Sequence, residues 1–204
     1  MLHRETVPQH TLALLERLSP ILKDDGFYLA GGTALSLRLG HRISVDLDFF
    51  KAGEFSIPEL IEKVKTISEE IKIVNNSQSS LALEVDHTLV EFLRYDYVHL
   101  SGPEMIDGIY LSSMIDNSLM KLSAIVGRGA KKDFADLAKI IEVISLDELI
   151  DKFGMKYPES DTFMLLKSLT YFDDAESDPE PHFLDESDWG SIKEQLLKAV
   201  KEIG

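Results

Sequence analysis

The 204-residue sequence contains no cysteine, which excludes disulfide bonds and metal sites built from thiolates. It also lacks any apolar run near the ~20 residues of a membrane-spanning helix. Its first residues, MLHRETVPQH, contain no apolar stretch of the kind found in signal peptides. The chain is long enough to bury a substantial core. We therefore expect a globular protein of the reducing cytoplasm with no membrane partner.

Basic residues are also scarce, since 21 lysines and arginines face 36 aspartates and glutamates, for a net charge of −15. This balance argues against a large DNA-binding surface, because broad phosphate binding needs a basic face. Much of the excess lies in residues 141–204, which hold 16 acidic and 6 basic side chains. The earlier part is closer to neutral, which leaves room for a small charged substrate or an RNA end gripped locally.

The spacing of apolar residues outlines the secondary structure. The apolar runs 81–85 and 88–95 flank Asp86-His87 and predict a β-hairpin. Helices are predicted over 8–24, 56–71, 113–126, 146–157 and 160–172, from about Lys131, and from Trp189 onward.

The chain changes character near residue 111. A connection rich in glycine precedes this point, and beyond it the pattern is helical only. We therefore predict an α+β protein with two parts, a sheet-bearing core at 1–111 and a helical C-terminal domain at 112–204 packed on it.

A glycine pair separates a predicted strand from a predicted helix. The apolar run 27–30 leads into Gly31-Gly32, and Thr33, the predicted N-cap, precedes apolar residues at helical spacing. Glycines let a ligand approach the main chain closely, and the free N–H groups of a helix start favour an anion. The segment predicts a phosphate cradle, although a simple tight turn has the same pattern.

Asp46 and Asp48 lie one residue apart in a predicted extended stretch, 43–50. Side chains alternate along a strand, so both carboxylates should project to one side. The apolar side chains between and beside them, Val45, Leu47 and Phe49, should face the other side. Adjacent carboxylates repel each other, and Mg²⁺ would relieve this repulsion because it binds carboxylate oxygens, water and substrate phosphate. The pattern therefore predicts a magnesium site, and a solvated strand face is the other interpretation.

Two further regions carry charged residues in apolar surroundings. Glu91 lies within the run LVEFL, where a carboxylate needs water, a partner or a metal ion. Lys121 lies between two apolar residues of a predicted helix, so its stem can pack while the ammonium reaches outward. The strongest basic cluster follows, with Gly127-Arg128-Gly129 and Lys131-Lys132. These residues form either a solvated helix surface or a phosphate-binding group.

The order G-G-T, twelve residues, then D-x-D resembles the motif of nucleotidyltransferases with the polymerase-beta-like fold. The longer string GGTALSLRLGHRISVDLDFF, with MKLSAIVGRGAKKDFADL downstream, resembles the AbiEii/AbiGii toxin family. This resemblance implies a small mixed sheet with flanking helices, followed by a helical half. It also assigns Lys121 and Asp133 to the active-site cleft, whereas Asp136 fits either the cleft or an interhelical cap.

The resemblance implies a metal-binding role for three carboxylates. Asp46 and Asp48 would hold Mg²⁺ against the nucleotide phosphates. Glu91, at a position where the family prefers aspartate, would share a second ion and accept the proton of the attacking hydroxyl.

The phosphates of the nucleotide would be bound by the remaining motif residues. Gly31, Gly32 and Thr33 would cradle them through backbone N–H groups. Lys121, supported by the basic cluster, and Arg42 would balance the charge of the leaving pyrophosphate.

The resemblance further implies the toxin of a bacterial toxin-antitoxin or phage-defence pair, with a cognate antitoxin. Such an enzyme would transfer a nucleotide from a nucleoside triphosphate, GTP being one option, to an RNA, with tRNA favoured, or to a protein. A catalytically silent nucleotide-binding regulatory module fits the residues as well. A metal-dependent phosphohydrolase or nuclease fits less well, because it needs no triphosphate cradle.

Residues 173–188, DDAESDPEPHFLDESD, contain eight acidic side chains and two prolines. This composition predicts a solvated loop. Phe183 and Leu184 are the side chains that would dock on the body, and an acidic loop beside a phosphate cleft would repel or mimic a nucleic-acid strand.

Overall fold

The neighbouring strands β2 (Leu47–Lys51) and β5 (Thr88–Arg94) run parallel, and their side chains alternate between the two faces of the sheet. We call the apolar face the core side and the opposite face the site side. On the core side Phe49 lies opposite Phe92, with the two rings stacked at a centroid distance of 5.8 Å. The other side of the same strands carries polar and charged residues. The alternation predicted around Asp48 is thus present in the strand.

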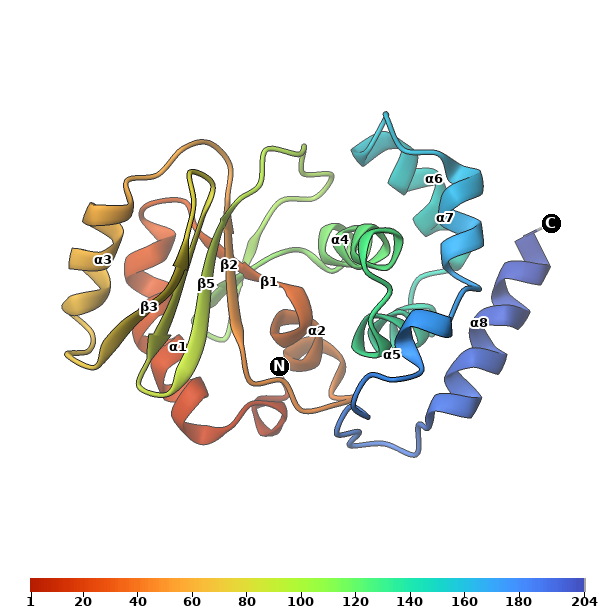
Figure 1. The fold of residues 1–204 in the computed structure, drawn as a ribbon, viewed down its shortest axis with the longest axis horizontal. Helices are drawn as coiled ribbons and strands as arrows, with labels where there is room; N and C mark the ends of the chain where they lie inside the picture. The colour runs from red at the N-terminus through yellow and green to blue at the C-terminus, as the bar shows by residue number, and fades with distance from the viewer. Residues whose placement is uncertain (204) are drawn as a thin grey trace.

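The computed structural model describes residues 1–203, and these contain one mixed sheet of seven strands in the order β3-β4-β5-β2-β1-β7-β6 (Figure 1). The remaining strands are β1 (Tyr28–Ala30), β3 (Ile71–Asn76), β4 (Ser80–Val85), β6 (Glu104–Ile106) and β7 (Ile109–Leu111). The helices are α1 (Gln9–Lys23), α2 (Gly31–Leu39), α3 (Ile57–Lys65), α4 (Met114–Gly127), α5 (Lys131–Ile140), α6 (Leu146–Lys156), α7 (Thr162–Ser168) and α8 (Trp189–Ile203). None of the helices in this range is long and apolar enough to cross a membrane.

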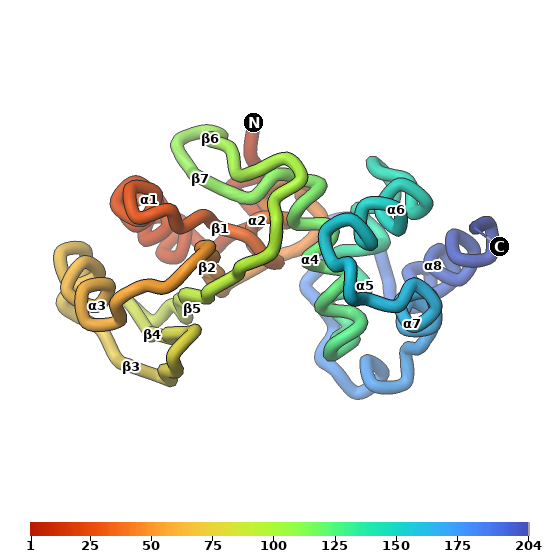
Figure 2. The backbone as a smooth tube through the Cα atoms, turned by 90° about the horizontal axis from the view of Figure 1, so that it is seen from above, coloured from red at the N-terminus to blue at the C-terminus, as the bar shows by residue number. Residues whose placement is uncertain are grey.

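Helices α1 and α3 cover the core side of the sheet (Figures 1 and 2). Leu14, Leu15 and Leu18 of α1 and Val64 of α3 are at most 1% exposed and pack against the apolar side of the strands. Each such side chain contributes about 1.5–3 kcal/mol through burial, so this layer anchors the sheet.

Helices α4 to α8 form a second layer with its own core, and Figure 2 shows α2 between it and the sheet. Leu35 of α2 belongs to this second core although it precedes most of the sheet in the chain. The last strand ends at Leu111 and α4 begins at Met114. The division of the chain at residue 111 into two domains stays a prediction.

Most predicted elements are present in the structure. The hairpin of 81–85 and 88–95 is confirmed by the antiparallel pairing of β4 and β5. Its turn residues Asp86 and His87 have φ of 48° and 62°, as a two-residue hairpin turn requires. The helices that start near residues 8, 113, 131, 146, 160 and 189 are also confirmed, within two residues at their starts.

Four local predictions are wrong. Helix α3 ends at Lys65, and the continuation to residue 71 is replaced by the edge strand β3. The connection at 104–111 is a second hairpin, β6-β7, that the pattern did not reveal. Strand β2 begins at Leu47, so the extended stretch is shorter than 43–50 and Val45 is 51% exposed.

The fourth wrong prediction is the helix N-cap at Thr33. Helix α2 begins two residues earlier, at Gly31 after Ala30, and Gly31 enters it with a φ of 68°. A residue with a side chain rarely adopts this angle, so the glycine lets the helix start directly at the strand end.

Residues 182–184 form a strap that pairs with the chain just before β2. Ile43 N–H donates to His182 C=O at 2.8 Å, and Leu184 N–H donates to His41 C=O at 2.9 Å. Most acidic side chains of 173–188 are exposed, as predicted for a solvated loop, but its centre is attached to the body through these bonds.

A buried ion pair fixes the connection after β5 to the helical layer. Asp116 of α4 accepts hydrogen bonds from the backbone N–H groups of 100–102 and from Lys156 of α6 at 2.7 Å. Lys156 also donates to the Val98 carbonyl at 2.8 Å. Both side chains of the pair are fully buried, so this connection is firmly positioned.

Candidate functional site

A cavity of about 540 Å³ lies between the site side of the sheet and helix α4. Its walls come from the start of α2, the segment 42–46, strands β2 and β5, and one face of α4. This volume is in the range of small-molecule sites. The two sequence blocks that carry the motifs therefore meet at one place in the fold.

The three predicted carboxylates Asp46, Asp48 and Glu91 all line this cavity. Asp48 on β2 lies directly opposite Glu91 on β5 in the parallel register. Asp46 precedes β2, and its carbonyl oxygen accepts a hydrogen bond from the Thr33 hydroxyl. Three basic side chains of the lining form ion pairs with Asp133 and Asp136, namely those of Arg42, Lys121 and Arg128.

Burial raises the pKa of Asp48 to about 6, and the negative charges of Glu91 and Asp46 add to the effect. Repulsion between carboxylates in one cavity is the condition that a divalent cation would relieve. The chemistry of this donor set therefore suits Mg²⁺.

The carboxylates do not form a ready-made metal cage. Within residues 1–203, no three His, Asp or Glu side chains are grouped closely enough to hold a metal ion. Mg²⁺ commonly binds through one or two carboxylates and completes its shell with water and substrate phosphate, so this arrangement is compatible with it. The assignment of all three residues as metal ligands stays a prediction.

Gly31 and Gly32 line the cavity at the start of α2, where a side chain would displace a neighbouring charged group. A Cβ atom on Gly31 would lie 2.5 Å from Oδ2 of Asp48, and one on Gly32 would lie 2.5 Å from Nη2 of Arg42. The glycine pair thus lets the acidic strand and the basic segment before it approach the turn.

The peptide of Gly31 is held by a residue that the motif analysis did not single out. Gly31 N–H donates to Oδ1 of Asn117 at 3.0 Å, and Nδ2 of Asn117 donates back to Gly31 C=O at 3.2 Å. Asn117 is fully buried on α4 and lines the cavity. The Gly31 N–H is therefore already bonded in this structure, and Gly32 is the turn residue whose role as a phosphate donor stays a prediction.

Thr33 lies beneath the cavity wall. It is 1% exposed, and its hydroxyl is 2.8 Å from Oγ of Ser44 in addition to its bond with the Asp46 carbonyl. The side chain thus attaches the segment before β2 to α2. It positions Asp46, and its own contact with a phosphate stays a prediction.

One face of α4 supplies the opposite wall. Asn117, Lys121, Ala124 and Arg128 are spaced by three or four residues and all line the cavity. This spacing places side chains on one helix face, so the periodicity of α4 contained a signal for Asn117.

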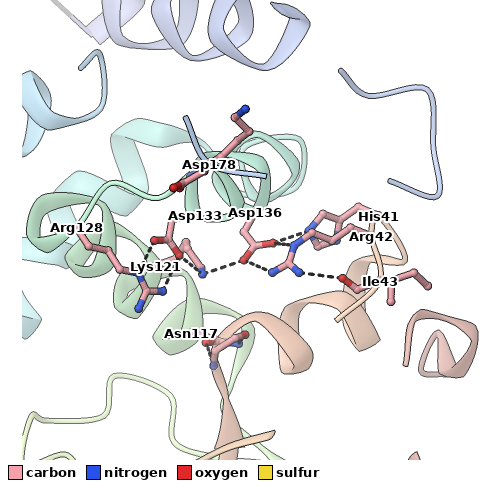
Figure 3. A network of polar contacts seen from close by, with 11 residues as sticks. His41, Arg42, Ile43, Asn117, Lys121, Arg128, Asp133, Asp136 and Asp178 are labelled. Atoms are coloured by element: carbon pink, nitrogen blue, oxygen red, sulfur yellow. Dashed lines mark hydrogen bonds and ion pairs between the residues drawn. The ribbon is translucent and has the colours of Figure 1, made fainter. Parts of the chain in front are cut away.

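Lys121 and Asp133, the two residues of the second sequence block, contact each other directly (Figure 3). Nζ of Lys121 lies 2.7 Å from Oδ1 of Asp133 and 2.8 Å from Oδ2 of Asp136. Burial alone would lower the pKa of Lys121, but the two aspartates raise it, so the ammonium is charged. Asp133 is fully buried behind the lysine, and only Lys121 of this pair lines the cavity.

Asp136 of α5 joins the two layers of the molecule through its ion pairs with Arg42 and Lys121. The sequence predicted either a position in the cleft or an interhelical cap for this residue. Arg42 donates to it from Nε at 2.6 Å and from Nη2 at 2.9 Å, and Nε2 of His41 lies 2.8 Å away (Figure 3). Burial alone would raise the pKa of Asp136, but Arg42 and Lys121 hold it well below its usual range. Arg42 lines the cavity but is paired with Asp136. Its predicted contact with the leaving pyrophosphate stays a prediction.

The cation at the mouth of the cavity is Arg128. Its side chain is 59% exposed, and its Nε lies 2.8 Å from Oδ2 of Asp133. In the network of Lys121, Arg42 and Arg128, three cations face only two carboxylates, and the exposed Lys132 adds another positive charge to the lining. This wall is therefore positive and faces the acidic strands.

Comparison with known proteins identifies relatives of this chain. The family model described as "Nucleotidyl transferase AbiEii toxin, Type IV TA system" matches residues 13–109. The uncharacterized protein aq_aa25 of Aquifex aeolicus (strain VF5) is 35% identical, and the match covers 92% of this chain and 93% of that protein.

Solved structures with the same fold include two bacterial proteins. JHP933 from Helicobacter pylori superposes with a TM-score of 0.59 at 19% identity, over 97% of this chain and 93% of that one. MenT4, a nucleotidyltransferase toxin from Mycobacterium tuberculosis H37Rv, superposes with a TM-score of 0.61 at 16% identity, over 93% and 82% of the two chains. The expected α+β nucleotidyltransferase fold is confirmed.

Proposed function

The chain belongs to the nucleotidyl transferase AbiEii toxin family and is a nucleotidyltransferase, and from this premise we propose a Mg²⁺-dependent transfer of a nucleotide from a nucleoside triphosphate to an RNA or protein acceptor. The observation that carries the proposal is the cavity itself. It brings carboxylates from two neighbouring strands beside a glycine turn and across from a positive helix face. These are the groups that phosphoryl transfer needs, because its catalysis is mostly positioning and electrostatic stabilisation.

Asp46 and Asp48 would hold Mg²⁺ together with the nucleotide phosphates, and Glu91 is the third carboxylate of the set. When bound, the ion supplies positive charge to the phosphate oxygens and lowers the pKa of the attacking hydroxyl. Asn117 orients the glycine turn, and Thr33 keeps Asp46 beside it. The chain's own contribution is thus a set of carboxylates held in place before substrate arrives.

In the proposed reaction an acceptor hydroxyl attacks the α-phosphorus of the triphosphate. The new bond joins the acceptor oxygen to that phosphorus, the bond to the β-phosphate oxygen breaks, and pyrophosphate leaves. The hydroxyl proton passes to Glu91, which faces the cavity beside Asp48. Lys121, Arg128 and Lys132 offset the charge that grows on the leaving pyrophosphate. Asp133 acts behind them by holding Lys121 and Arg128.

The family implies a toxin with a cognate antitoxin, and we propose that its target is an RNA of the bacterial cytoplasm, with GTP among the nucleotides to be tested. The net charge supports a local grip on an RNA end more than a broad nucleic-acid surface.

A catalytically silent nucleotide-binding module is the second candidate. It is favoured by one observation, the engagement of Lys121 with two buried carboxylates, which reduces the charge available to a triphosphate. Such a module would bind a nucleotide in the same cavity without transferring it.

Labelled nucleotide distinguishes the two functions. Purified protein is incubated with each α-³²P nucleoside triphosphate, Mg²⁺ and total bacterial RNA, beside the variants Asp46→Asn and Asp151→Asn. Asp151 is exposed on α6, outside the cavity, and provides the matched control. Label in RNA or protein with the wild type and Asp151→Asn, lost in Asp46→Asn, supports the transferase. Triphosphate binding without transfer of label by the wild type supports the silent module, and shortened RNA would indicate a nuclease.

A further inference from the structure

The cavity has an aromatic end that the proposed phosphate chemistry does not use. Phe50, Leu93 and Tyr95 line it, and the carboxylates of Asp48 and Glu91 lie two residues earlier on the same strands as Phe50 and Leu93. All four side chains therefore project to the same side of the sheet.

The two ends are separated by a distance that suits a nucleoside. A strand rises about 3.3 Å per residue, so Phe50 and Leu93 lie roughly 7 Å beyond the carboxylates along the strands. Phe50 and Leu93 are paired in the parallel register of β2 and β5, so their side chains lie side by side on the cavity wall. In a nucleotide, the sugar likewise separates the α-phosphate from the base.

The rings of this wall are held in fixed orientations. Phe50 packs edge-on against Tyr95, with centroids 5.6 Å apart and an interplanar angle of 82°. On its other side, Phe50 lies 6.3 Å from the ring of Tyr28 at an angle of 27°. The chain after Tyr95 is fixed by the Asp116–Lys156 pair described above. A ligand ring would therefore meet a preorganised surface.

The wall offers ring faces more than hydrogen bonds. The hydroxyl of Tyr95 is hydrogen-bonded to that of Tyr157 on α6, and Lys156 lies 5.5 Å from the centroid of the Tyr95 ring. Phe50 and Leu93 have no polar side-chain atoms. Flat heteroaromatic rings suit such a wall, because bases stack on aromatic side chains without requiring a particular edge pattern.

We propose that Phe50, Leu93 and Tyr95 form the subsite for the base of the incoming nucleoside triphosphate, which they hold by stacking and apolar contact. The inference rests on the proposed function and deepens it, because it assigns the orientation of the nucleotide in the cavity. The triphosphate lies against the glycine turn and the carboxylates, and the base lies over β2 and β5 toward Tyr95.

The test compares nucleotides with a ligand that has phosphates but no base. Isothermal titration calorimetry in Mg²⁺ buffer measures Kd for ATP, GTP, CTP, UTP and inorganic tripolyphosphate. The variants are Phe50→Leu, which keeps an apolar side chain but removes the ring, and Phe50→Trp, which keeps a ring. Phe163→Leu on α7 is the control, since Phe163 is 71% exposed and lies outside the cavity. Thermal melting of each variant checks the fold, and Leu93→Thr provides a second test should Phe50→Leu unfold.

We expect Phe50→Leu to raise the Kd of the bound nucleoside triphosphates about tenfold, as loss of base stacking does, and to leave the Kd of tripolyphosphate unchanged. Phe50→Trp and Phe163→Leu should retain the wild-type values. Equal effects of Phe50→Leu on nucleotides and tripolyphosphate, or no effect on either, would overturn the subsite. Equal affinity of the wild type for all five ligands would also overturn it while leaving the proposed function intact. A wild type that binds neither nucleotide nor tripolyphosphate would overturn the proposed function together with the subsite.

Discussion

The side-chain amide of Asn117 accepts a hydrogen bond from Gly31 N–H and donates one to Gly31 C=O, at 3.0 and 3.2 Å. Through these bonds helix α4 fixes the turn that carries the proposed phosphate cradle. Asn117→Ala would remove the side-chain partner of the half-buried Gly31 N–H, at a cost of about 1 kcal/mol in the free energy of unfolding. We also expect a fall in kcat of roughly 10- to 100-fold, because small displacements of reacting groups are costly.

The measurement combines urea unfolding with a nucleotidyl-transfer assay. Ser118→Ala is the matched control, because Ser118 is the next residue of α4, is also buried, and bonds only to the Met114 carbonyl. Loss of stability in Asn117→Ala with unchanged kcat would contradict the positioning role.

We expect Gly31→Ala to lower activity by more than the strain of an alanine with positive φ would explain. Both Gly31 and Gly53 have positive φ, 68° and 78°, so alanine at either position costs about 1–2 kcal/mol. Only at Gly31 would the new Cβ lie 2.5 Å from Oδ2 of Asp48, whereas at Gly53 nothing lies within 4 Å. We expect similar losses of stability but at least tenfold lower activity for Gly31→Ala alone. Equal activities of the two variants would show that the approach of Asp48 to the turn is irrelevant.

Asp136→Asn should be strongly destabilising. It removes the carboxylate that neutralises Arg42 and Lys121, and breaking a buried charge pair in this way costs about 3–5 kcal/mol. For a chain of this size that corresponds to a fall in Tm of roughly 10 °C. Glu202→Gln, which breaks an exposed pair with Lys198, is expected to change stability by no more than about 0.5 kcal/mol. Calorimetric unfolding tests this, and equal effects of the two variants would contradict the prediction.

Asp48 should make the metal-free protein less stable as the pH rises. Its pKa is raised to about 6 by burial and by Glu91 and Asp46, against about 3.9 in an unfolded chain. Between these values the folded state binds more protons, so stability falls with increasing pH and stays reduced above pH 6. In the absence of metal, Asp48→Asn is therefore expected to raise Tm by a few degrees at neutral pH and to have little effect near pH 4.

Differential scanning fluorimetry across this pH range makes the measurement, with Asp151→Asn as an exposed control. Added Mg²⁺ should raise the Tm of the wild type at neutral pH more than that of Asp48→Asn. An identical response of both proteins to Mg²⁺ would exclude Asp48 as a ligand.

The placement of Asp48 could be predicted because it depends on local alternation along β2, and the parallel register brings Glu91 to it. Asp46 precedes the strand, so alternation does not account for its position. The clamp between Asn117 and Gly31 joins residues 86 positions apart, so no local pattern contains it. The same holds for Asp136, whose partners Arg42 and Lys121 come from both layers.

The missed strands have a different cause. Strand β3 is an edge strand whose residues are mostly exposed, so it lacks the alternation that marks a half-buried strand. Ile67 and Ile71 continued the helical spacing of α3 and concealed its end at Lys65. The hairpin of β6 and β7 has three residues in each strand, too few for a periodic pattern.

The strap at 182–184 has a consequence for the order in which the enzyme matures. Its backbone bonds to His41 and Ile43 support the segment that leads into Asp46. The ribosome makes that segment well before its partner strap, because helices α4 to α7 lie between the two in the chain. The rim of the cavity therefore gains this support only after α4 to α7 have been synthesised, so a shorter nascent chain lacks it.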